Sequence, residues 1–162
     1  MKVLVPVVAF IAAIAVAGCS SSDSSPTSAP TKAATAAATP VTKVAVNLKE
    51  WSISPSVATA KAGAVTFNVK NDGPKYGHEF VILKTGLAAS DLPRKADGSV
   101  DEEGTGVESP GEVGDLPVGG QDSSTIELTP GRYLFVCNLV DQSDSGAQLH
   151  FKNGMFTEFT VQ

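Results

Sequence analysis

The chain has 162 residues, a formal net charge of -5 and 18% charged residues. Because an acidic chain without any cluster of lysine and arginine offers no electrostatic footprint for a polyanion, the composition gives no support for nucleic-acid binding. For the same reason, any attachment to a membrane would have to come from a lipid and not from a basic patch.

The first 18 residues have the composition of a secretory signal peptide. Lys2 precedes an apolar run from Val3 to Ala17, and small residues end this run directly before Cys19. The run is shorter than the roughly 20 apolar residues that a membrane-spanning helix needs. Its end resembles the bacterial lipobox, which implies that cleavage leaves Cys19 lipidated at the new N-terminus. The alternative is an ordinary signal peptide in which this cysteine is incidental.

Residues 19–43 follow as a tether. They consist almost entirely of Ser, Thr, Ala and Pro, and they include no aromatic residue. Such a segment buries too little apolar surface to offset the entropy lost on ordering, so we expect it to stay mobile.

Residues 44–162 have the size of one domain. Alternating or short apolar runs bounded by turn residues predict strands, and these are KVAVNLKEW, AVTFNVKN, HEFVILK, STIELT, GRYLFVCNL and MFTEFTVQ. Beyond the signal peptide, no stretch has sustained helical periodicity. Short strands separated by Gly- and Pro-containing turns predict an all-β fold, a β-sandwich. Five aromatic residues at strand positions are interpreted as core: Trp51, Phe67, Phe80, Phe135 and Phe159.

The connection over residues 85–121 does not fit this pattern. It is long, acidic and without a clear strand, and residues 88–92 have room for one turn of helix. Its carboxylates could bind a hard cation, but their spacing lacks the regular pattern of a calcium loop. We therefore interpret it as a solvated acidic surface.

Four side chains near the predicted strand ends could bind a metal ion. Once Cys19 is lipidated, Cys137 has no partner for a disulfide, so burial or a metal must protect its thiol in an oxidising compartment. His78, His150 and Met155 each have an ordinary explanation, as a polar residue at a strand start, a loop residue and a core residue. Together, two imidazoles, one thiolate and one thioether form the donor set of a blue copper site. Zinc is the alternative, although its structural sites rarely use methionine.

The order of these residues resembles the small cupredoxins related to plastocyanin. His78 opens a strand, Cys137 ends PGRYLFVC, and His150 and Met155 lie in HFKNGM before a final strand. The resemblance covers residues 44–162 and implies a Greek-key β-sandwich that binds one mononuclear copper ion. It also implies that His78, Cys137, His150 and Met155 are the ligands.

Two features depart from that family. Twelve residues separate Cys137 from His150, whereas plastocyanin-like proteins have only a few. Because longer loops add little closure entropy, we expect this polar insert to loop out while its ends stay fixed. The second departure is Glu79, which follows His78 where many relatives carry an asparagine that braces the ligand loop.

The sequence therefore predicts an electron carrier and not an enzyme, since the protein fills all four copper positions and leaves none for a substrate. We expect a monomer of the cell envelope that is lipid-anchored outside the cytoplasm and exchanges single electrons with redox protein partners. One alternative is a copper-binding or copper-trafficking lipoprotein that uses the same ligands. Another is a metal-free β-sandwich that binds a partner through the acidic connection over residues 85–121.

Overall fold

The computed structural model describes residues 41–142 and 146–162, and these are almost entirely β-structure, as the sequence predicts. The predicted signal peptide, Cys19 and the tether up to residue 40 lie outside the described residues. Within the described part, no helix is long and apolar enough to cross a membrane. The elements in chain order are β1 (Thr42–Lys49), β2 (Ser52–Pro55), β3 (Thr59–Ala60), β4 (Gly63–Asn71), β5 (His78–Thr85), the 3-10 helix η1 (Ala89–Asp91), β6 (Val107–Leu116), β7 (Gln121–Leu128), β8 (Gly131–Val136), β9 (Val140–Asp141), β10 (Gln148–Leu149) and β11 (Phe156–Val161).

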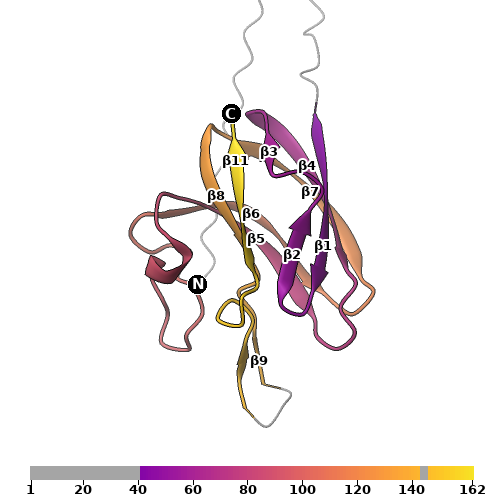
Figure 1. Ribbon diagram of the computed structural model, residues 1–162, viewed down its shortest axis with the longest axis vertical. Coiled ribbons are helices and arrows are strands. Elements are labelled where there is room, and N and C mark those ends of the chain that lie inside the picture. The colour runs from indigo at the N-terminus through magenta and orange to yellow at the C-terminus, as the bar shows by residue number, and fades with distance from the viewer. Residues whose placement is uncertain (1–40, 143–145) are drawn as a thin grey trace, which may run out of the picture. The chain divides into compact units, whose positions relative to one another are not determined.

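Two main sheets form a sandwich (Figure 1). Their strand orders are β2-β1-β4-β7 and β3-β11-β8-β5-β6. Both sheets are mixed, because β1 runs parallel to β4 and β11 runs parallel to β3, while the other pairs are antiparallel. Most neighbours in a sheet are not consecutive in the chain, so the chain crosses repeatedly from one sheet to the other.

The core lies between the sheets and follows the predicted alternation. Val44, Val46 and Leu48 of β1 are at most 2% exposed, and β4 buries its residues 65, 67 and 69 in the same way. Four phenylalanines meet in the centre, where Phe67 contacts the other three rings at centroid distances of 5.3 to 6.3 Å: Phe80, Phe135 and Phe159. Each buried aromatic ring removes a large apolar area from water and so contributes strongly to the stability of the core.

The connection over residues 85–121 differs from its prediction in one respect. The expected short turn of helix is present as η1, but the 10 residues of β6 form a strand in a segment for which the sequence predicts none. β6 is the edge strand next to β5, and two register irregularities interrupt their pairing. Pro110 is tolerated at such an edge, where a missing amide leaves no unpaired neighbour. Bulges and glycines break the alternation, which explains why periodicity did not reveal this strand.

Candidate metal centre

Three of the four predicted ligands lie at strand ends that the fold brings together. His78 is the first residue of β5, and Cys137 directly follows β8. Because β5 and β8 are antiparallel neighbours, with Val81 opposite Val136, the start of one strand lies beside the end of the other. His150 follows β10. All three side chains are fully buried.

Backbone hydrogen bonds fix the turn that follows His150. The amide of Met155 donates to the carbonyl of His150 at 3.1 Å, and the amide of Cys137 donates to the carbonyl of Met155 at 3.0 Å. Gly154 has a φ of +100°, a conformation that side-chain-bearing residues rarely adopt. The turn therefore returns the chain to the end of β8, so that the thiol and the second imidazole are held by one set of contacts.

The donor atoms of these three residues converge. Nδ1 of His78 lies 3.1 Å from Nδ1 of His150, and the Sγ atom of Cys137 lies 3.8 Å and 3.3 Å from these two nitrogens. Among the described residues, this is the group of His, Cys, Asp and Glu side chains whose ligand atoms lie within 4.8 Å of one another. The acidic connection over residues 85–121 contributes no such group in the described structure.

The spacing fits one metal ion. Bonds of about 2.0 Å to nitrogen and about 2.3 Å to sulfur, arranged in a trigonal plane, separate the donor atoms by about 3.5 to 3.8 Å. The observed separations of 3.1 to 3.8 Å differ from this by a few tenths of an ångström. Two imidazoles and one thiol are also the donors that suit copper better than a hard cation.

The electrostatics favour a neutral site before a metal ion binds. Burial raises the pKa of the Cys137 thiol to about 12, although the amides of Glu79 and Leu139 partly oppose this shift. Burial also lowers the pKa of His78 to about 4, and it lowers the pKa of His150. Near neutral pH both imidazoles are therefore uncharged and can donate to a metal, whereas the ion must displace the thiol proton.

Glu79 braces the thiol loop. Its Oε1 accepts a hydrogen bond from the amide of Asn138 at 2.9 Å, and its own amide lies 3.5 Å from the Sγ atom of Cys137. Burial raises the pKa of the Glu79 carboxyl to about 7; the Asn138 amide opposes this shift, and nearby carboxylates, of which Glu102 is the strongest, add to it. The side chain of Asn138 in turn bonds to both backbone groups of Val100 and to Glu102. The Glu79 side chain therefore fixes the backbone of the residue that follows Cys137.

The turn between β1 and β2 covers the two imidazoles, which the sequence did not reveal. The sequence predicts Trp51 to be a core residue on a strand, but it lies in this turn and is only half-buried. Its ring meets that of His150 edge to face at 5.1 Å, and the ring of Tyr76 contacts both, at 5.4 and 5.7 Å. Glu50 precedes Trp51 and lies near His78. No motif links positions 50 and 51 to the ligands, because only the packing of the two sheets brings them together.

Met155 is fully buried and belongs to the same apolar cluster as Cys137. Its place in the turn is compatible with the predicted role as a fourth ligand, and that role stays a prediction.

The insert between Cys137 and His150 forms the two-stranded hairpin of β9 and β10, which projects away from the sandwich (Figure 1). Leu149 pairs with Val140, and the amide of His150 donates to the carbonyl of Leu139 at 3.1 Å. The insert thus leaves the sandwich and returns with its two ends paired.

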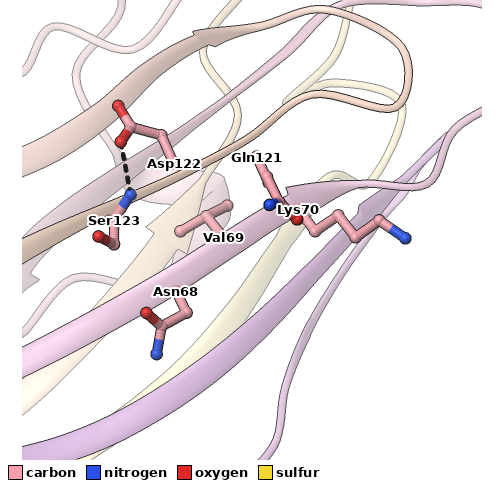
Figure 2. Close-up of a pocket in the computed structure, with 6 residues that line it drawn as sticks. All are labelled: Asn68, Val69, Lys70, Gln121, Asp122 and Ser123. Atoms are coloured by element: carbon pink, nitrogen blue, oxygen red, sulfur yellow. Dashed lines mark hydrogen bonds between the residues drawn. The ribbon is translucent and has the colours of Figure 1, made fainter.

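A separate hollow is lined by paired residues of β4 and β7 and is shown in Figure 2. Its volume is about 280 Å³, and it is lined by Asn68, Val69, Lys70, Gln121, Asp122 and Ser123. None of the predicted ligands lines it. This hollow therefore has no part in the candidate metal centre.

Solved structures with the same fold include two auracyanins and a rusticyanin. Auracyanin from Roseiflexus castenholzii aligns with 75% of this chain and 97% of its own at a TM-score of 0.53 and 21% identity. Rusticyanin from Thiobacillus ferrooxidans aligns with 75% of this chain and 77% of its own, at a TM-score of 0.51 and 20% identity. Auracyanin A from Chloroflexus aurantiacus, described as a "blue" copper protein, aligns with 76% of this chain and 100% of its own, at a TM-score of 0.50 and 19% identity. No protein-family model and no curated protein sequence matches the chain.

Proposed function

We propose that this chain, whose fold is the cupredoxin fold that the sequence predicts, binds one copper ion and carries single electrons. The observation that supports this function most directly is the convergence of three donor atoms, Nδ1 of His78, Nδ1 of His150 and Sγ of Cys137, in a fully buried pocket. These three residues would hold the ion, and Met155 would be a fourth, weaker ligand. The similarity of the fold to a protein described as a "blue" copper protein supports the choice of metal.

The mechanism depends on how little the site has to move. Copper, when bound, supplies the change between Cu(II) and Cu(I). His78 and Cys137 are fixed by paired strands, and His150 is fixed by the hairpin and the turn that follows it. Full burial excludes water from all three side chains. Because these contacts would hold the ligands in nearly the same positions in both oxidation states, little reorganisation would oppose electron transfer.

The biological setting that we propose comes from the sequence. A lipid on Cys19 would hold the protein at the outer face of a membrane in the cell envelope, and the tether would let the domain reach redox protein partners. We propose that the domain acts as a monomer. It has no role as an enzyme in this proposal, because the four ligands leave no coordination position for a substrate.

A copper-trafficking protein with the same ligands is the second candidate. It would need a site that opens to release the ion, and a loose insert between Cys137 and His150 would favour that role. The pairing of β9 with β10 and the complete burial of the ligands instead favour a site that retains its ion. Cyclic voltammetry of the copper form separates the two candidates, because a carrier of electrons gives fast and reversible electron transfer.

The experiment that tests the proposed function is an absorption and electron-spin-resonance spectrum after addition of Cu(II). We expect an intense visible band from thiolate-to-Cu(II) charge transfer, since the thiolate of Cys137 is a direct ligand. The variant Cys137→Ala should lose this band. Glu158→Gln removes the charge of an exposed side chain that pairs with Arg132, and it serves as a control that should keep the band. A copper-loaded protein without the band would contradict the proposal.

A further inference from the structure

The carboxylate of Glu50 is held in a defined position beside the metal centre. Its Oε1 accepts hydrogen bonds from the amides of Lys75 at 3.0 Å and Tyr76 at 2.9 Å. Gly73 leaves the space that this carboxylate fills, because a Cβ atom at that position would lie 2.7 and 2.8 Å from its two oxygens. The side chain is only 15% exposed. Two backbone amides and the space left by Gly73 therefore fix the negative charge of Glu50 in the turn between β1 and β2.

This carboxylate faces the ring of His78. Its Oε1 lies 3.9 Å from Nε2 of that ring, on the side away from the Cys137 sulfur, which is near Nδ1. In the described structure, Nε2 of His78 is fully buried and makes no hydrogen bond. When Nδ1 binds a metal ion, a neutral imidazole carries its proton on Nε2. A buried N–H group without an acceptor costs free energy. A shift of the Glu50 Oε1 atom by about 1 Å toward Nε2 would let it accept a hydrogen bond from this N–H group.

We infer that Glu50 is a positioning residue of the metal centre, whose carboxylate orients the His78 ring through Nε2 and favours the oxidised ion through its negative charge. This inference rests on the proposed copper function. Metal-bound histidines commonly donate their second ring nitrogen to a carboxylate, which fixes the tautomer and strengthens the ligand. Nothing in the residue spacing of the sequence points to Glu50, which is 28 positions before His78.

The sign of the electrostatic effect follows from the charges. Cu(II) carries one more positive charge than Cu(I), so a nearby carboxylate stabilises the oxidised state more than the reduced state. Water screens this interaction only weakly, because the ligand rings are buried and Glu50 is largely so. Glu79 acts differently, since its carboxylate accepts from the Asn138 amide and does not face a ligand ring in these contacts.

The first test is the reduction potential of Glu50→Gln, which keeps the size of the side chain and removes its charge. We expect the Cu(I) to Cu(II) ratio at a fixed applied potential to rise about tenfold, which is about 59 mV for a one-electron couple. Glu127→Gln is the matched control. It removes the same charge from an exposed position on β7. Glu127 pairs with Ala64 near the start of β4, whereas the end of β4, at Asn71, leads toward His78. The control should leave the potential unchanged.

The second test keeps the charge and moves it. In Gly73→Ala the new Cβ atom would displace the Glu50 carboxylate, so the potential should shift in the same direction as in Glu50→Gln. In the metal-free protein, nitrogen NMR should also show that Glu50→Gln lowers the share of the His78 ring with its proton on Nε2. A normal visible band together with an unchanged potential and an unchanged tautomer in both variants would overturn the inference and leave the copper function intact. Absence of the band in the unaltered protein would instead refute the proposed function.

Discussion

The thiol of Cys137 and the two imidazoles lie in a pocket that stabilises uncharged side chains. Burial raises the pKa of the thiol and lowers that of each imidazole, so the metal-free domain keeps all three side chains without charge near neutral pH. Amides of the surrounding loops partly offset the burial of the thiol. The same residues thus pack as uncharged, fully buried side chains and remain able to bind a soft metal ion.

A single substitution tests whether Met155 is a copper ligand or only a core residue. Met155→Leu keeps the core filled, because exchanges between these two side chains usually cost less than about 1.5 kcal/mol. We expect copper to stay bound and the reduction potential to rise, since loss of a weak thioether donor disfavours Cu(II). Potentiometric titration measures the change.

The control for this substitution is Leu83→Met, an exchange at a fully buried position in the other apolar cluster, which should leave the potential unaltered. If Met155→Leu has the potential and the spectrum of the unaltered protein, Met155 is a core residue and not a ligand.

The hairpin of β9 and β10 shows how a long insert can preserve a metal site. Pairing of Val140 with Leu149 brings the two ends of the insert together directly before His150. The position of His150 then depends on this pairing and on the turn up to Met155, and not on the number of residues between Asp141 and Gln148.

Shortening the insert tests this interpretation. Replacing residues 142–147 with Asn-Gly gives a two-residue turn between Asp141 and Gln148, which suits an antiparallel hairpin. We expect the shortened protein to keep the visible copper band. Gly154→Ala serves as the contrasting variant, because its φ of +100° strains any side-chain-bearing residue by about 1 to 3 kcal/mol. It should weaken the site although it leaves the chain length unchanged. Loss of the band in the shortened protein alone would show that the insert itself supports the ligands.

The whole domain couples metal binding to stability, because the ligands come from segments that are far apart in sequence. His78 and His150 are separated by 72 positions, and they meet only when the domain is folded. A ligand that binds the folded state and not the unfolded state stabilises the fold by mass action.

Copper should therefore raise the midpoint of thermal unfolding. Free copper at about 100 times its dissociation constant stabilises a folded protein by about 2.7 kcal/mol. Calorimetry with and without copper measures this shift, and Cys137→Ala should reduce it. An equal midpoint with and without copper would favour the alternative of a metal-free module that binds a partner through its acidic connection.

Local sequence patterns were enough to predict the β-sandwich, the buried faces of β1 and β4, and the three side chains that converge on one point. Alternation of apolar residues and turn chemistry are local properties, and the ligand types are visible in the chain. Three features became visible only in the folded domain: β6 is an irregular edge strand, the insert is a paired hairpin, and Glu50 and Trp51 lie against the two imidazoles. These contacts depend on sheet packing between residues distant in sequence, which no local pattern records.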